Sequence, residues 1–214
     1  MTKEGCYKKE RKQIMYKKLF TIIFALLMFA LISSNITQAQ TTKAKVVYPM
    51  FSISPVGGVQ FPIASLNDNY KTSWNAGVDF SLKFNRETSL YLYAGYHDMP
   101  SSDASTHPGA SVIQITAGPR YIFTSQAIKA QFFIEGGMGV YIFGTKEFTT
   151  TGTDPSVIVP STSNVNFGIN VGPGVTIPLG KSVDIIIKSK LHDMFMDGDS
   201  KIFITALLGI DFRL

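Results

Sequence analysis

The stretch Ile202–Leu214, IFITALLGIDFRL, alternates in character from one residue to the next. Successive side chains of a β-strand point to opposite faces, so Ile202 and every second residue after it share one face. That face is apolar throughout, whereas the other face carries Asp211 and Arg213. The stretch exceeds the ~9–11 residues with which a tilted strand crosses a bilayer. Such a strand needs a neighbour along both edges, and a closed barrel supplies both.

The same alternation recurs in seven earlier segments, so the sequence predicts eight strands. Segment 164–179 is the clearest, because Val, Phe, Ile and Leu residues there alternate with Asn, Gly and Thr. The predicted strands span residues 51–61, 74–84, 89–97, 111–124, 130–143, 164–179, 183–195 and 202–214. We therefore expect an all-β fold, an eight-stranded antiparallel up-and-down transmembrane β-barrel.

The connections between these strands alternate in length. Residues 85–88, 125–129 and 180–182 make short turns, and residues 197–201 make an intermediate one. Residues 62–73, 98–110 and 144–163 make long connections that are rich in Ser, Thr, Asn, Asp, Gly or Pro. Short turns at one end and long loops at the other are typical of a transmembrane barrel, whose long loops lie outside the cell.

Alternation alone leaves open which face looks outward. A soluble secreted barrel of the lipocalin kind would turn its apolar face inward, around a ligand. The polar face here consists of Gly, Asn, Ser and Thr with scattered charges, whereas soluble exteriors are dense in Lys and Glu. Aromatic residues also lie near the predicted strand ends, as expected for interfacial girdles. These are Trp74, Tyr96 and Phe143 at the long-loop end, and Phe84, Tyr121, Phe123, Phe132 and Phe212 at the other.

Residues 1–39 have the pattern of a secretory signal peptide with a basic N-terminal extension. Lys17 and Lys18 precede the apolar run 19–32, and small residues then lead to a predicted cleavage site after Ala39. A transmembrane helix is the alternative, but it needs ~20 apolar residues. Met15 is a second candidate start. Residues 40–50 are a short lead-in, and residues 51–214 form the predicted barrel.

The charge of the chain resides in that leader. The chain has 20 basic and 15 acidic residues, of which residues 1–40 hold seven and two, so the remainder holds 13 of each. A neutral mature part gives no support for nucleic-acid binding. The single cysteine, Cys6, also lies in the leader, so the mature part can form neither a disulfide nor a cysteine metal site.

The chain resembles the outer membrane protein β-barrel family, the eight-stranded class of the transmembrane domain of outer membrane protein A. The resemblance covers roughly residues 46–214, and its most specific part is a C-terminal assembly signal matched by Gly209, Phe212 and Leu214. Leu207 and Leu214 depart from the usual polar and Phe residues. The resemblance implies a cell outer membrane location, contact with outer-membrane lipid, and recognition by the barrel assembly machinery. We expect no cofactor and no enzymatic activity, because the chain shows no enzyme signature.

Nine charged residues fall on the predicted inward face. They are Asp79, Lys83, Arg120, Glu135, Asp184, Lys188, Lys190, Asp211 and Arg213. Charges in a narrow lumen must pair or stay hydrated. We therefore expect a charge-paired interior that rigidifies the barrel, with an ion-conducting gate as the alternative.

No motif in the chain carries recognisable catalytic chemistry. His97, Asp98, Asp103 and His107 are spaced too irregularly for a metal site. Asp193 is the one misfit, because alternation places it on the lipid face. It lies either near the outer end of its strand, where a charge costs less, or next to a bulge that shifts the phase.

Three functions remain open. The first is a structural or surface-interaction barrel that acts through its long loops 62–73, 98–110 and 144–163. The second is a narrow channel or transporter for ions or small apolar compounds. The third is the soluble ligand-binding barrel considered above.

Overall fold

The computed structural model describes residues 48–104, 107–123, 130–149, 158–196 and 199–214. The predicted signal peptide 1–39 and most of the lead-in lie outside these residues. Within them, no helix has the length and apolar character that crossing a membrane requires.

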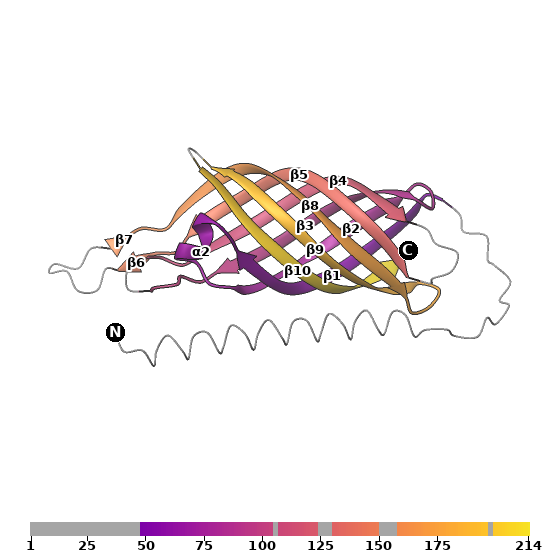
Figure 1. Cartoon of the computed structure of the whole chain (residues 1–214), viewed down its shortest axis with the longest axis horizontal. Coiled ribbons are helices and arrows are strands. Elements are labelled where there is room, and N and C mark those ends of the chain that lie inside the picture. The colour runs from indigo at the N-terminus through magenta and orange to yellow at the C-terminus, as the bar shows by residue number, and fades with distance from the viewer. Residues whose placement is uncertain (1–47, 105–106, 124–129, 150–157, 197–198) are drawn as a thin grey trace, which may run out of the picture. The chain divides into compact units, whose positions relative to one another are not determined.

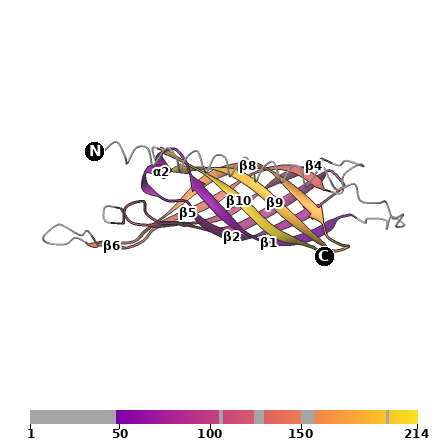
Figure 2. The same cartoon turned by 60° about the horizontal axis from the view of Figure 1, so that its bottom comes forward.

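Eight strands form one closed antiparallel barrel (Figures 1 and 2). In chain order they are β1 (Met50–Pro62), β2 (Ser73–Lys83), β3 (Thr88–Met99), β4 (Ala110–Phe123), β5 (Gln131–Thr145), β8 (Thr162–Pro178), β9 (Val183–Met196) and β10 (Asp199–Arg213). Each strand pairs with its neighbours in sequence, and β1 closes the barrel against β10. The predicted strands are all present, and the observed bounds differ by one to three residues at most ends.

The strands are staggered around the barrel. From Ile53 the paired residues run through Phe80, Leu92, Ala117, Met138, Ile169, Asp193 and Ile202. Ile202 then accepts a hydrogen bond from the amide of Ile63, so one circuit climbs from residue 53 to residue 63 of the first strand. A stagger of this size tilts the strands and leaves a narrow interior that side chains can fill.

The outer wall is apolar and the interior is polar. Large exposed hydrophobic side chains occur on all eight strands, among them Phe80, Leu92, Ile115, Val171 and Leu208. The buried set includes charged, amide and hydroxyl side chains from every barrel strand. The prediction that the apolar face looks outward is therefore confirmed. The arrangement of a soluble barrel, with the apolar face around an internal ligand, is not the one observed.

Aromatic side chains ring both ends of the outer wall. At the long-loop end the Trp74 and Tyr96 rings lie 5.5 Å apart, and at the short-turn end Tyr121 and Phe123 lie 5.1 Å apart. Phe143 does not belong to this belt, and the prediction for it is wrong. It is 8% exposed and points into the lumen, because the alternation that puts Ile142 outside puts Phe143 inside.

Three prolines interrupt the ladder on the outer wall. Pairing is missing at Pro55 against β10, at Pro119 against β5, and at Pro173 against β9. A proline has no N–H to donate, so the partner strand loses one hydrogen bond at each position. The register is the same on both sides of each gap, so the barrel stays closed.

The long loops contain structure that the sequence pattern does not predict. The loop after β1 folds into the short helix α2 (Ser65–Asn69), and the loop after β5 carries a two-stranded ribbon of β6 (Phe148–Thr149) and β7 (Ile158–Val159). Figure 1 shows α2, β6 and β7 at the same end of the barrel, opposite the C-terminus. The two loops therefore contain ordered segments.

Candidate functional site

Five charged side chains from four strands meet at the middle of the lumen. Arg120 and Glu135 are direct cross-strand partners, and Arg120 Nε donates to Glu135 Oε2 over 2.6 Å. Arg120 Nη2 also lies 3.0 Å from Asp79 Oδ2. Lys188 pairs with Asp79, and its Nζ lies 3.4 Å from Glu135 Oε1. Lys190 Nζ lies 2.7 Å from the same Glu135 oxygen. We call these five residues the charge cluster.

The charge cluster is buried in the barrel interior. None of its members is more than 5% exposed. Three cations face two carboxylates, and aromatic rings give two of the cations further electrostatic stabilisation. Lys190 Nζ lies 4.0 Å from the centre of the Tyr91 ring, and the Arg120 guanidinium lies 4.6 Å from that of Phe133. Loss of either carboxylate would leave buried cations without a partner, which is costly.

The remaining predicted lumen charges form separate contacts at the short-turn end. Arg213 Nη2 lies 2.6 Å from Asp184 Oδ1, and Ser54 Oγ donates to Asp211 over 2.5 Å. Lys83 Nζ donates to Gln131 over 3.3 Å. Lys83, Asp184 and Asp211 line a cavity of about 20 Å³ at this end of the lumen, which has room for about one water molecule. The structure thus divides the predicted interior charges into a central cluster and this group near the turns.

A layer of neutral polar side chains lies on the long-loop side of the charge cluster. Tyr91 donates to Asn170, whose amide donates to Tyr141 over 3.3 Å. Tyr141 lies 3.1 Å from His192 Nδ1, and His192 Nε2 lies 3.1 Å from Thr205. This pattern fits a neutral His192 imidazole, which accepts through one nitrogen and donates through the other.

His97 belongs to the same layer. Its Nε2 lies 2.9 Å from Gln114 Oε1, and its Nδ1 lies 3.5 Å from the Asn75 amide. Among the described residues, no group of three or more His, Cys, Asp or Glu side chains is placed to hold a metal ion. The layer could not be predicted from the sequence, because its members are spread over seven strands and show no motif.

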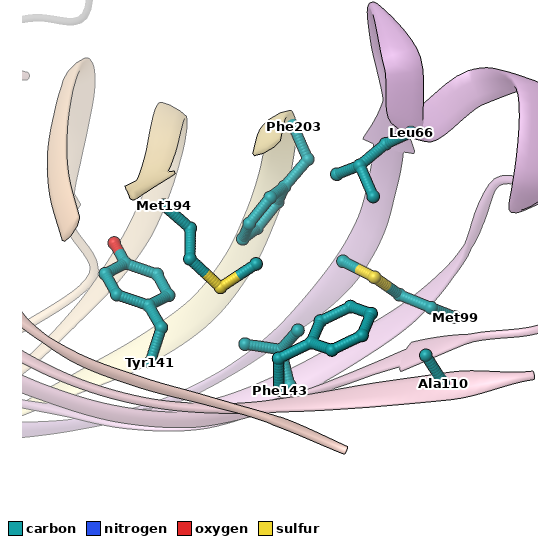
Figure 3. Close-up of a cluster of buried hydrophobic side chains, with 8 residues drawn as sticks. Leu66, Met99, Ala110, Tyr141, Phe143, Met194 and Phe203 are labelled. Carbon is teal, nitrogen blue, oxygen red and sulfur yellow. The ribbon is translucent and has the colours of Figure 1, made fainter. Parts of the chain in front are cut away.

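An apolar plug closes the lumen at the long-loop end (Figure 3). Phe143 and Phe203 project from opposite sides of the wall, and Leu66 reaches in from α2. Eight buried residues make up the plug: Leu66, Met99, Ala110, Val112, Tyr141, Phe143, Met194 and Phe203. Tyr70 packs its ring edge against Phe143, with centroids 6.1 Å apart, and burial raises the pKa of its phenol.

Large interior side chains fit against glycines on neighbouring positions. The Tyr93 hydroxyl lies 2.6 Å from where a Cβ at Gly77 would sit, and the Tyr141 ring lies 2.7 Å from the equivalent point at Gly168. Tyr91 similarly occupies the space beside Gly137. The inward glycines therefore make room for the tyrosines, which is how a narrow barrel accommodates aromatic rings inside.

Asp193 stays on the outer face, as alternation predicts. Its pairing with Ile202 belongs to an unbroken ladder between β9 and β10, so the bulge offered as one explanation is wrong. Its carboxylate accepts a hydrogen bond from the Ser200 hydroxyl, and the residue is half-buried. The position lies three residues before the end of β9, toward the loops, where a charge costs less than at mid-membrane.

The residues of the predicted assembly signal lie on the closing strand. Gly209 pairs with Val56 of β1, Phe212 faces outward, and the Leu214 amide donates to Phe51 over 2.9 Å. Recognition of these residues by an assembly machinery stays a prediction.

Comparison with known proteins shows the fold. No protein-family model matches the chain, and no curated protein matches it. Several solved structures resemble it over nearly their whole length. A major outer membrane protein from Thermus thermophilus gives a TM-score of 0.56 at 9% identity, covering 77% of this chain and 99% of that one.

Neisserial surface protein A gives a TM-score of 0.55 at 12% identity, covering 76% of this chain and 96% of its own. Ail, the attachment invasion locus protein of Yersinia pestis, gives 0.50 at 14% identity, covering 78% and 100%. At these identities the likeness concerns architecture alone. The chain has the fold of the eight-stranded outer-membrane β-barrels.

Proposed function

We propose that this protein is an integral outer-membrane barrel with a sealed lumen, and that it acts through its extracellular loops. The observation that carries the proposal is that buried side chains fill the lumen at its middle and at its long-loop end, beyond the small cavity near the short turns. The charge cluster occupies the middle, the neutral polar layer lies above it, and the apolar plug closes the long-loop end. An interior packed in this way serves stability, which leaves the loops as the part available for function.

An outer-membrane location is supported by two independent features. The outer wall is apolar between two aromatic belts, as lipid contact requires. The solved structures with this fold that are quoted above include an outer membrane protein and a surface protein. In this placement the short turns face the periplasm, and α2 with the β6–β7 ribbon faces the outside. We propose no catalytic role.

The competing function is a narrow channel, and the lumen argues against it. An ion entering from the short-turn end meets Arg120, Lys188 and Lys190, which already pair with Asp79 and Glu135. Beyond them it would have to enter the apolar plug without compensating hydrogen bonds, which is costly. Conduction would therefore require the charge cluster and the plug to rearrange together.

Single-channel recording in planar bilayers tests the sealed lumen. We expect no conductance steps from the refolded protein at any voltage that the bilayer withstands. The plug variant Phe143→Ala with Phe203→Ala should also stay silent, because the charge cluster remains behind it. Regular conductance steps from the unmodified protein would overturn the proposal and favour the channel.

A further inference from the structure

The β6–β7 ribbon continues strands β5 and β8 beyond the ends of the neighbouring barrel strands. The β6–β7 pairs Phe148↔Val159 and Thr149↔Ile158 have the same register as the β5–β8 pairs below them, such as Thr145↔Thr162. The ribbon is therefore one continuous antiparallel ladder, interrupted only around Pro160. Figure 1 shows it extending beyond the strand ends around it.

One edge of this ribbon is covered and the other is open. On the β4 side, Ala110 pairs with Thr145, and the Lys146 amide donates to Gly109 over 2.8 Å. On the β9 side, pairing with β8 begins only at Phe167, which faces Phe195. Among the described residues, none pairs with the 158–164 segment along this second edge. We call residues 158–164 the open edge.

Main-chain groups of alternate residues point to opposite sides of a strand. Pro173 interrupts the pairing with β9 and not that with β5, so its missing N–H is one that would point toward β9. Residues of β8 with odd numbers therefore direct their N–H and C=O groups to that side. Continued upward, this pattern places the main-chain groups of Ser161 and Ser163 at the open edge.

The open edge lacks most of the features that usually keep strand edges from pairing. Natural edges carry charges, especially Lys, prolines, or bulges that turn them away from other chains, and of these the open edge has only Pro160. Residues 158–164 hold no charged residue, and every one of them is exposed, with Ile158 at 65%. Pro160 is the single interruption. An uncharged, exposed strand with free N–H and C=O groups is a template for one more strand.

A second copy of this chain is not the strand that fits. Two barrels standing upright in one membrane have β8 running in the same direction, from the loop end to the turn end. Every neighbouring pair in this barrel is antiparallel, and continuing the β8–β9 ladder upward requires a strand running the opposite way. Facing walls of two such barrels also tilt in opposite directions and cross, because barrel strands tilt by about 35–45°.

We propose that the open edge binds an extended segment of another protein, which adds to β8 as an antiparallel strand above the end of β9. This inference rests on the proposed function, since it names the part of the loops that makes the contact. Hydrogen bonds to main-chain groups around Ser161 and Ser163 supply the binding, so the partner is selected for an extended, uncharged backbone more than for particular side chains.

Amide hydrogen exchange of the barrel in lipid nanodiscs tests this directly. The probe is a synthetic eight-residue peptide of alternating Val and Thr with a lysine at each end. Without peptide, we expect the Ser161 and Ser163 amides to exchange rapidly. With saturating peptide, they should exchange at least about tenfold more slowly, whereas amides on the β4 side should be unchanged.

Two substitutions at one position separate main-chain from side-chain effects. Ser163→Pro removes the N–H at the open edge and should abolish the slowing of exchange by the peptide, which is then measured at the Ser161 amide. Ser163→Ala keeps the N–H and should retain the slowing. A difference in gel mobility between unboiled and boiled samples confirms that each variant has folded. If Ser163→Pro does not fold, Ser161→Pro removes the neighbouring edge N–H and takes its place.

Three results would overturn the inference: slow exchange that is already present without peptide, no slowing by the peptide, or equal slowing in Ser163→Pro. Slow exchange that disappears on dilution would point to self-association. If the barrel shows no conductance in bilayers and the peptide does not slow its amide exchange, only the open-edge site is refuted. A barrel that conducts refutes the sealed lumen whatever the peptide does.

Discussion

At the scale of single residues, Glu135 is the most consequential side chain in the lumen. It faces Arg120, Lys188 and Lys190, and only Asp79 would remain to balance these three cations without it. Removing one partner of a buried ionic network typically costs about 3–5 kcal/mol. We expect Glu135→Gln to lower the free energy of unfolding by about that amount, measured by urea denaturation in lipid vesicles.

The matched control is Asp211→Asn, which changes a carboxylate of the same lumen that accepts a hydrogen bond from Ser54. It should cost clearly less, because it stands apart from the charge cluster and Asn can still accept that bond. Adding Lys190→Met to Glu135→Gln should recover part of the loss, since Lys190 pairs with Glu135. Equal costs for the two single variants would contradict the central role of the cluster.

The glycines give a second prediction at this scale. A Cβ at Gly77 would lie 2.5 Å from the Ala94 carbonyl oxygen and 2.6 Å from the Tyr93 hydroxyl, whereas a Cβ at Gly57 would meet nothing closer than 3.7 Å. Gly77→Ala should therefore destabilise the barrel by about 1–3 kcal/mol, as overpacking does. Gly57→Ala should change the unfolding free energy little in the same assay, and the reverse order would contradict the packing described here.

At the scale of elements, helix α2 depends on one side chain. Leu66 is 1% exposed within the plug, and α2 has no side-chain cap at its N-terminus. An isolated five-residue helix is not stable in water. Leu66→Ser should therefore release α2 and speed amide exchange at Tyr70, whose N–H bonds to the Leu66 carbonyl. Asn67→Ser, an exposed neighbour, is the control and should leave that exchange unchanged.

Sequence patterns reveal the strands of this protein but not its loops. Strands follow from a period of two that persists over many residues, and that period also decides which residues face inward. Phe143 lies near a strand end but faces inward, so whether a residue holds an odd or even place in the alternation predicts its orientation better than its distance from the strand end. Helix α2 escapes such reading because packing of Leu66 stabilises it, not local propensity. The extension of β8 beyond the end of β9 cannot be predicted from the sequence, because alternation does not reveal where the pairing of two strands stops.

For the interior too, the sequence predicts some features and leaves others unpredicted. Alternation identifies Asp79 and Lys188 as inward-facing, but 109 positions separate them in the chain. Their pairing depends on the stagger of all eight strands, which no single segment encodes. The neutral layer around His97, Tyr141 and His192 is likewise a product of register. The sequence therefore predicts which residues fill the lumen, and the structure shows which of them meet.

At the scale of the whole molecule, the protein is a closed barrel whose lipid-facing wall is apolar and whose lumen is filled by buried side chains at its middle and at its long-loop end. Barrels of this kind resist unfolding by detergent until heated, because every strand has two neighbours and no edge frays. A soluble barrel with the opposite orientation would not partition into membranes. Membrane partition and resistance to detergent together therefore test the central claim, that this barrel faces lipid with its apolar wall.

The most direct measurement is membrane fractionation followed by electrophoresis of boiled and unboiled samples. We predict that the protein stays in the outer-membrane fraction after washing with carbonate or high salt, and that the unboiled form migrates faster than the boiled form. A protein that is released by the wash and migrates identically with and without boiling would contradict that claim.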